Sequence, residues 1–150
     1  MKNLVLLGAG YGNIRALSRL LTSDLPEDVH ITLIDRNSFH CFKTEYYALV
    51  AGTVPEQHIR IPLPTHEKLK VVYGDITTID TANKKVELSN GKSVSYDDLI
   101  IGLGCEDKYH NVPGAPEHTY SIQTIEKTRN AYENVNSLTP NSVIGVVGAG

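Results

Sequence analysis

A short glycine-rich segment near the N-terminus has the residue types and spacing that bind phosphate groups. The first glycine of such a segment permits a tight turn, and the second lets the backbone approach a pyrophosphate. N–H groups at the start of a following helix then meet the phosphates, assisted by the helix dipole. We therefore predict a dinucleotide site at Gly8, Ala9, Gly10, Tyr11, Gly12 and Asn13.

The segment departs from the full G-x-G-x-x-G pattern at its last glycine. Asn13 occupies that position, and Gly12 stands one place early. The third glycine of the pattern serves helix-to-strand packing. We expect Asn13 to shift the helix slightly outward and to leave the phosphate contacts of the first two glycines intact.

An acidic residue follows at the position where a dinucleotide site needs one. Asp35 ends the second strand-like segment, about twenty residues beyond the glycines, where a carboxylate can accept both hydroxyl hydrogens of an adenosine ribose. Arg36 comes next and is included in the predicted site. The structural alternative for Asp35 is a solvated aspartate that caps a turn.

Other chemistry has little support in the sequence. Cys41 and Cys105 lack the close spacing of a zinc site or a disulfide scaffold, and the six histidines show no His-Glu-x-x-His spacing. Gly91-Lys92-Ser93 resembles the end of a P-loop, but Val86 stands where the first glycine is required. A Gly-x-Ser-x-Gly elbow is absent from the sequence. We predict no metal site and name no catalytic residue.

The elements that position the glycines and Asp35 follow a strand, turn, helix, strand order. Residues 4–7 form a continuous apolar run, typical of a strand buried on both faces of a parallel sheet. Apolar residues between positions 14 and 21 recur at helical spacing, and residues 29–35 are rich in β-branched side chains. Together they predict a right-handed βαβ unit.

The next part of the chain is less regular. The sequence predicts a short helix over 44–50 and irregular surface chain around Pro55, Pro62 and Pro64. Beyond these, strands are expected over 70–73 and 97–102, a small antiparallel meander between 75 and 96 around the turn pair Asn90-Gly91, and a helix over 124–136.

The last residues repeat the pattern of the first. Residues 144–150 match residues 4–10 in their apolar run and glycines. This repeat predicts a buried strand over 143–147 that leads into a second phosphate-binding loop. Because a natural domain rarely ends on a buried strand, we expect the chain to be the N-terminal part of a longer protein.

Composition limits the functional classes. The chain has 150 residues, 41% hydrophobic and 21% charged, which suits one sizeable core and excludes a long disordered protein. A net charge of -3 without a basic run disfavours nucleic acid as a partner. The apolar runs fall short of the roughly 18 residues of a membrane span, and a signal peptide fits poorly. We expect a cytoplasmic protein.

The glycine segment, Asp35, the meander and residues 96–104 together resemble the two-dinucleotide-binding flavoprotein superfamily, the pyridine nucleotide-disulfide oxidoreductases. Within that superfamily the chain is most similar to type II NADH dehydrogenases. The similarity is carried by residues 8–17, 37–44, 51–53, 103–104 and 112–114.

The resemblance implies an α/β fold: a Rossmann-like parallel sheet with a small antiparallel β-meander, truncated at the start of a second Rossmann unit. Residues 1–120 would form the first part of a discontinuous FAD-binding domain. Residues 121–150 would form a linker helix and the first strand of a truncated NAD(P)H-binding domain.

The resemblance also implies further cofactor contacts. Residues 102–104 would pass close to the flavin's phosphates, and the second loop would hold NADH or NADPH. Lys43 and Thr44 would lie on the flavin side, and Asp75 and Ile76 would offer backbone groups to the adenine. The remaining predicted cofactor residues are Gly102, Leu103, Gly104, Gly148 and Gly150.

The implied reaction passes hydride from NAD(P)H through FAD to a quinone or similar acceptor. Disulfide reduction is disfavoured, because the position five after Cys41 is Tyr46 and no second thiol stands there. A sulfide:quinone oxidoreductase stays open, since Cys105 alone does not decide it. The chain by itself is expected to be inactive.

Two other classes of function stay open. An ordinary NAD-dependent Rossmann dehydrogenase would bind NAD at the first site and no flavin. A non-enzymatic nucleotide-binding or redox-sensing module would keep the glycine loop without turnover. The sequence also leaves open a homodimer and a peripheral attachment of the longer protein to the inner face of the cell membrane.

Overall fold

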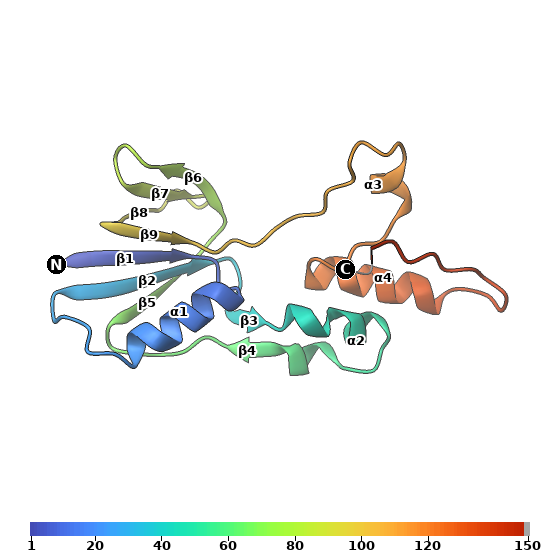
Figure 1. Ribbon diagram of the computed structural model, residues 1–150, viewed down its shortest axis with the longest axis horizontal. Helices are drawn as coiled ribbons and strands as arrows, with labels where there is room; N and C mark the ends of the chain where they lie inside the picture. The colour runs from blue at the N-terminus through green and yellow to red at the C-terminus, as the bar shows by residue number, and fades with distance from the viewer. Residues whose placement is uncertain (149–150) are drawn as a thin grey trace. The chain divides into compact units, whose positions relative to one another are not determined.

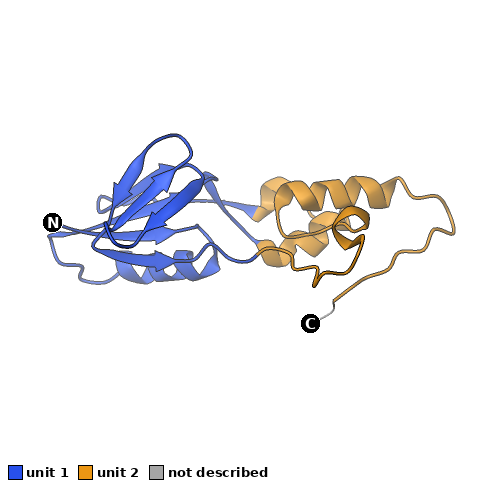
Figure 2. Ribbon diagram, turned by 90° about the horizontal axis from the view of Figure 1, so that it is seen from above, with its two compact units in different colours: residues 1–42, 60–105 blue, residues 43–59, 106–150 orange. Residues whose placement is uncertain are grey.

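The computed structural model describes residues 1–148 of the chain (Figure 1). The chain divides into two compact units, which Figure 2 shows in different colours. The first unit comprises residues 1–42 and 60–105, and the second comprises residues 43–59 and the chain from Glu106 onward. The predicted glycine segment, Asp35 and residues 102–104 all belong to the first unit.

The first unit is built on a four-stranded sheet in the order β5-β2-β1-β9. Every pairing in this sheet is parallel, so all four carboxyl ends lie at one edge. The glycine segment after β1, Asp35 at the end of β2 and Gly102 after β9 therefore meet at that edge. The strands are β1 (Lys2–Leu7), β2 (Val29–Asp35), β5 (Leu69–Tyr73) and β9 (Asp98–Ile101).

Apolar side chains cover both faces of this sheet, which explains the continuous apolar runs of β1 and β2. Successive side chains of a strand point to opposite faces. Leu6 accordingly packs with Leu17 of helix α1 (Tyr11–Leu21). Val5 and Leu7 pack instead with Val86 of the meander. The predicted strand, turn, helix, strand unit is confirmed.

The meander is a three-stranded antiparallel sheet in the order β6-β7-β8. Gly91 has φ +77° in the turn between β7 and β8, as the Asn90-Gly91 pair predicts. Its strands are β6 (Ile76–Asp80), β7 (Lys85–Leu88) and β8 (Ser93–Ser95).

A second small sheet joins β3 (Phe39–Cys41) and β4 (Arg60–Pro62) in antiparallel register. The guanidinium carbon of Arg60 lies 4.5 Å from the centre of the Phe39 ring, a cation–π contact that supports the pairing. The prediction of irregular chain here was wrong for β4. Pro62 is compatible with the strand because it stands at the strand's end, where a missing N–H removes little of the ladder.

The second unit is helical. Its short helices are η1 (Lys43–Glu45), α2 (Tyr46–Val50), η2 (Glu56–Ile59) and α3 (Ala115–His118), and its longest is α4 (Ile125–Asn136). Helix α2 packs on α4. Thr124 caps α4, where its hydroxyl accepts a hydrogen bond from the Lys127 N–H at 3.2 Å. The predicted helices over 44–50 and 124–136 are confirmed, and α3 was not predicted.

The predicted strand over 143–147 is wrong in this structure. The segment has no regular secondary structure, and Val143 and Val147 are 95% and 93% exposed. A strand needs a neighbour whose backbone groups complete its hydrogen bonds. Within residues 1–148 this segment pairs with none.

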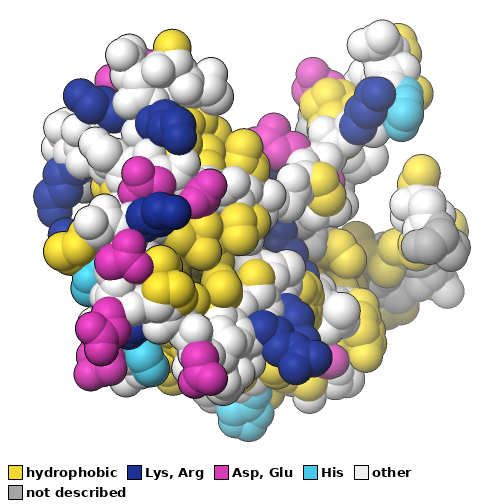
Figure 3. All heavy atoms as spheres, turned by 60° about the vertical axis from the view of Figure 1, so that its left-hand side comes forward, with side chains coloured by type: hydrophobic (Ala, Val, Ile, Leu, Met, Phe, Trp, Pro, Cys, Tyr) yellow, Lys and Arg dark blue, Asp and Glu magenta, His cyan; other side chains and the backbone are white. Residues whose placement is uncertain are grey.

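The charged side chains on the surface are mixed in sign, in agreement with the small net charge of -3. On the face shown in Figure 3, acidic and basic side chains are interspersed and do not separate into patches of one sign. Across the described residues, none of the helices has both the length and the apolar character needed to cross a membrane.

The packing of Leu17 in the core between α1 and the sheet predicts how much its truncation lowers the stability of the chain. Leu17 is fully buried, so Leu17→Ala should lower the free energy of unfolding by about 2–5 kcal/mol through lost contacts and a cavity. Urea titration followed by circular dichroism measures this change. The matched control is Leu138→Ala, because Leu138 is 46% exposed. Equal losses in the two variants would contradict the assignment of Leu17 to the core.

Candidate functional site

The glycine segment crosses the end of β9 at backbone contact distance. Gly8 has φ +89°, and a Cβ placed on it would lie 2.6 Å from the Gly102 carbonyl oxygen. A Cβ on Gly10 would lie 3.4 Å from the same oxygen. The Gly102 N–H donates to the Leu7 carbonyl at 2.9 Å, which ties the two segments together. Gly8 therefore has neither the space nor the backbone conformation for a side chain.

Asn13 fills the place of the missing third glycine with a buried side chain. Its Nδ2 donates to the Leu7 carbonyl at 2.7 Å and to the Gly8 carbonyl at 2.8 Å. A Cβ on Gly102 would lie 2.6 Å from the Asn13 Cγ. The side chain thus occupies space that a glycine on the neighbouring strand leaves open. The sequence placed Asn13 in the dinucleotide site and showed its departure from the glycine pattern, but it did not indicate this pairing with Gly102.

Asp35 lies beside the glycine segment, as predicted from its place at the end of β2. Its Oδ2 accepts a hydrogen bond from the Ala9 N–H at 2.6 Å, and its Oδ1 accepts one from the Asn37 N–H at 2.7 Å. A carboxylate oxygen has two lone pairs, so each of these oxygens can accept one further donor. This geometry suits a pair of ribose hydroxyls.

His40 is a residue of this site that sequence reasoning missed. It is 4% exposed, and its Nδ1 lies 2.7 Å from the Ala9 carbonyl oxygen. Its ring contacts Tyr11 and Phe42 edge-on, with centroid distances of 4.9 Å and 5.5 Å. The sequence shows His40 between Phe39 and Phe42, but it indicates neither strand β3 nor the contact of His40 with the glycine segment.

The start of α1 is open to an anion. Gly10 is the N-cap and makes no side-chain capping bond, and the first turn contains no acidic residue. The first N–H groups of a helix lack partners within it, and they carry the positive end of the helix dipole. Such a helix start suits a phosphate group.

Two of the predicted cofactor residues, Arg36 and Asp75, form an ion pair. The Arg36 Nε lies 3.0 Å from the Asp75 Oδ1, and both side chains are largely exposed. An exposed pair of this kind contributes little to stability, about 0–1 kcal/mol. Ile76 opens β6 next to this pair. The structure thus places Arg36, Asp75 and Ile76 in the same unit as Asp35.

The other predicted cofactor residues are more scattered. Leu103 and Gly104 follow β9, and Gly104 has φ +82°. Lys43 and Thr44 open η1 in the second unit, so their expected place on the flavin side stays a prediction. Gly148 has φ +85° and ends the described chain, and Gly150 lies outside the described residues.

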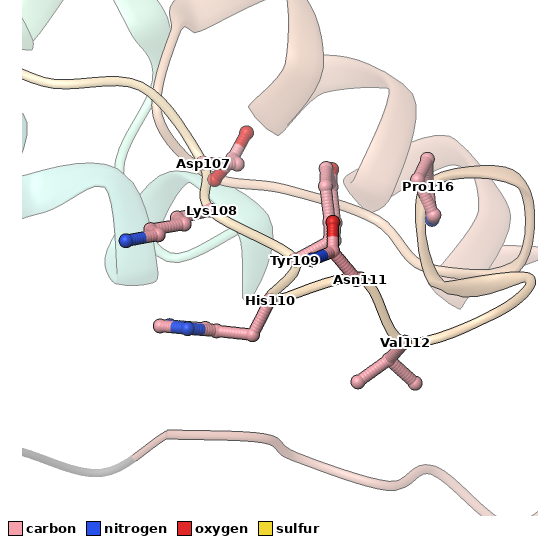
Figure 4. Close-up of a pocket in the computed structure, with 7 residues that line it drawn as sticks. All are labelled: Asp107, Lys108, Tyr109, His110, Asn111, Val112 and Pro116. Atoms are coloured by element: carbon pink, nitrogen blue, oxygen red, sulfur yellow. The ribbon is translucent and has the colours of Figure 1, made fainter.

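A cavity of about 580 Å³ lies in the second unit, in the segment between β9 and α3 (Figure 4). His110 and Asn111 form its turn and have φ of 50° and 60°, an uncommon conformation for residues other than glycine. None of the predicted cofactor residues lines this cavity. Its lining residues are Asp107, Lys108, Tyr109, His110, Asn111, Val112 and Pro116.

An ion pair anchors this segment to α4. The Lys127 Nζ donates to the Asp107 Oδ2 at 2.7 Å. Hydrogen bonds from Lys127 and then from Ser121 lower the pKa of the Asp107 carboxyl below its ordinary value. The same contact raises the pKa of Lys127.

The contact between Gly102 and Asn13 predicts that substitutions at the two positions are coupled, which a double-mutant cycle tests. Gly102→Ala should destabilise the chain, because its Cβ would clash with the Asn13 side chain. In an Asn13→Gly background that side chain is gone, so the same substitution should cost less. We expect a coupling free energy of about 0.5–3 kcal/mol from urea unfolding of the four proteins. Additive losses would show that Asn13 and Gly102 do not share this space.

The ion pair on α4 predicts a pH effect. The folded-state pKa of Asp107 is lowered, so its contribution to stability is present above the unfolded-state pKa and lost as the pH falls through the folded-state pKa. Asp107→Asn should therefore flatten the acid limb of a plot of melting temperature against pH. Asp98→Asn, an exposed aspartate on β9, is the control. Identical acid limbs for wild type and Asp107→Asn would contradict the prediction.

Comparison with known sequences identifies close relatives. NADH dehydrogenase-like protein YutJ of Bacillus subtilis (strain 168) is 61% identical over 150 residues, which are 100% of this chain and 42% of that protein. The type II NADH:quinone oxidoreductase of Staphylococcus haemolyticus is 30% identical over 131 residues, 85% of this chain and 32% of that protein. The chain therefore spans less than half the length of these relatives.

Solved structures share the fold. The sulfide:quinone oxidoreductase of Aquifex aeolicus superposes with a TM-score of 0.81 at 26% identity, over 94% of this chain and 33% of that one. NDH2 of Plasmodium falciparum, solved with NADH, superposes with a TM-score of 0.70 at 19% identity, over 95% of this chain and 31% of that one. These likenesses confirm the predicted α/β Rossmann-like fold.

The family assignment follows from the match over nearly the whole chain. Residues 2–150 match the family described as pyridine nucleotide-disulphide oxidoreductase. The glycine segment, Asp35 and the meander, on which the resemblance rested, all lie within the matched range. The chain belongs to the pyridine nucleotide-disulphide oxidoreductase family.

Proposed function

We propose that this chain supplies the FAD-binding site of an oxidoreductase that passes hydride from NAD(P)H through FAD to a quinone or similar acceptor. The observation that carries the proposal is the edge of the parallel sheet where Gly8, Asp35 and Gly102 meet. There the turn at Gly8 lies against the Gly102 carbonyl, and the Asp35 carboxylate is held 2.6 Å from the Ala9 nitrogen.

The residues at this edge fit the adenosine diphosphate portion of FAD. Gly10 and the uncapped start of α1 would hold the diphosphate through backbone N–H groups. Asp35 would accept the ribose hydroxyls, and Arg36 with Asp75 would border the adenine. Bound flavin supplies the chemistry of accepting a hydride and passing electrons onward. The protein's part is to hold that group in place and to keep water from it.

The nicotinamide and quinone parts of the proposal rest on the relatives. Their names include NADH dehydrogenase-like protein and type II NADH:quinone oxidoreductase. Gly148 is the described residue that would belong to the second nucleotide loop.

Identification of the bound nucleotide tests the first site. The chain is purified and denatured, and any released nucleotide is identified by mass spectrometry. We expect FAD. Release of NAD would favour the ordinary Rossmann dehydrogenase and overturn the proposal. A chain purified without nucleotide is titrated with FAD and with NAD, and preference for NAD would overturn it equally.

Substitution of Asp35 tests the assignment of the ribose contact. Asp35→Asn keeps the shape of the side chain and removes its charge, so FAD should bind about ten- to a hundredfold more weakly. Flavin fluorescence anisotropy measures the dissociation constant. Asp24→Asn, an exposed aspartate after α1, is the control and should bind FAD as the wild type does. Equal affinities for all three proteins would remove Asp35 from the site.

A further inference from the structure

The loop between β1 and α1 is held by three side chains that act on two successive peptide groups. In the Gly8–Ala9 peptide, the carbonyl accepts from Asn13 at 2.8 Å and the N–H donates to Asp35 at 2.6 Å. This peptide is therefore fixed from both sides before any ligand binds.

The next peptide, Ala9–Gly10, is held at its carbonyl end by His40. The Ala9 oxygen lies 2.7 Å from the His40 Nδ1, and a carbonyl can only accept a hydrogen bond. Nδ1 must therefore carry the proton. The imidazole is 4% exposed and packs edge-on against Tyr11 and Phe42, which limits its rotation.

The contact between His40 and the Ala9 carbonyl also determines where the Gly10 N–H points, because both groups belong to one planar peptide. The described chain contains no cis peptide bond, and in a planar trans peptide the carbonyl and the N–H point in opposite directions. Because His40 holds the Ala9 carbonyl on one side, the Gly10 N–H points to the other. Gly10 is the N-cap of α1, so this N–H belongs to the group of donors at the helix start.

We infer that His40 is a positioning residue for the nucleotide diphosphate: it orients the Ala9–Gly10 peptide so that the Gly10 N–H faces the phosphates. This role rests on the proposed binding of FAD at this loop. The side chains of Asn13 and Asp35 hold the preceding peptide, whereas His40 holds the Ala9–Gly10 peptide. His40 acts through Ala9 and does not itself contact the cofactor in this role.

His40→Asn and His40→Gln both introduce an amide, so a comparison of the two variants tests where the N–H donor lies rather than whether the side chain is polar. The Asn side chain places an N–H donor near the site of the histidine Nδ1, whereas the longer Gln places its donor near the site of Nε2. His40→Gln and His40→Phe should weaken FAD binding about tenfold, because the Ala9 carbonyl loses its partner. His40→Asn should stay within about threefold of wild type, although it lacks the ring.

FAD titration of the four proteins, followed by fluorescence anisotropy, measures these changes. Amide hydrogen exchange without ligand supplies a second readout. The Ala9 N–H is protected by its hydrogen bond to Asp35. It should exchange faster in His40→Gln and His40→Phe than in wild type and His40→Asn, because the Ala9 carbonyl has lost its partner and the loop opens more often. A purely structural role for the ring would instead make His40→Phe the mildest variant. His40→Asn and His40→Gln remain a matched pair if His40→Phe does not fold.

The outcomes distinguish this inference from the proposed function. Equal FAD affinity in His40→Asn and His40→Gln, with wild type binding FAD, overturns the role of His40 and leaves the proposed function standing. If wild type binds NAD and not FAD, the proposed function is overturned, and FAD is no longer the ligand that His40 would serve. Weak binding by His40→Gln with rescue by His40→Asn supports both.

Discussion

The backbone crossing between Gly8 and Gly102 is the constraint on which the candidate site depends. A Cβ at Gly8 would lie 2.6 Å from the Gly102 oxygen, a distance that no side chain atom can occupy. The close approach lets β1 and β9 stay paired up to their carboxyl ends. It also holds the turn after β1 against the end of β9, where Gly8 is buried and Gly10 is partly exposed. A larger residue at Gly8 would separate the loop from β9 and disrupt the loop itself.

Asn13 shows how the same packing problem is solved without the third glycine of the usual pattern. In that pattern a small residue on the helix lets the helix lie close to the strand. Here the helix carries an amide, and the small residue is Gly102, directly after the neighbouring strand β9. The amide then stabilises the turn, since it donates to the Leu7 and Gly8 carbonyls. The departure from the pattern is thus accompanied by a compensating glycine elsewhere.

Sequence patterns predicted the elements whose regularity is local and strong. The βαβ unit, the meander and α4 all follow from apolar periodicity and turn residues. Three-residue strands such as β3 and β4 contain too little pattern to detect, and Pro62 argued against the second of them. The apolar run over 143–147 misled for a different reason: hydrophobicity indicates a tendency to be buried but not the presence of a partner strand.

The residues of the candidate site also fall into those that the sequence predicted and those that it did not. The proximity of Gly8, Gly10 and Asp35 was predictable, because a known spacing places them at the ends of neighbouring strands beside one helix. His40 was not, because its contact with Ala9 depends on how β3 folds back toward the loop, which no spacing encodes. Gly102 was predicted as a cofactor residue from the family resemblance, but its packing against the Asn13 side chain was not.

These contacts have a consequence for binding. Ordering a residue's backbone costs about 1–2 kcal/mol at 25 °C, and a flexible loop would take that free energy from its ligand. In this chain Asn13, Asp35 and His40 have already fixed the Gly8–Ala9 and Ala9–Gly10 peptides through hydrogen bonds within the protein. Under the proposed function, a diphosphate at the start of α1 would therefore meet donors that are already oriented. Its affinity would then depend on side chains that need not touch the phosphates.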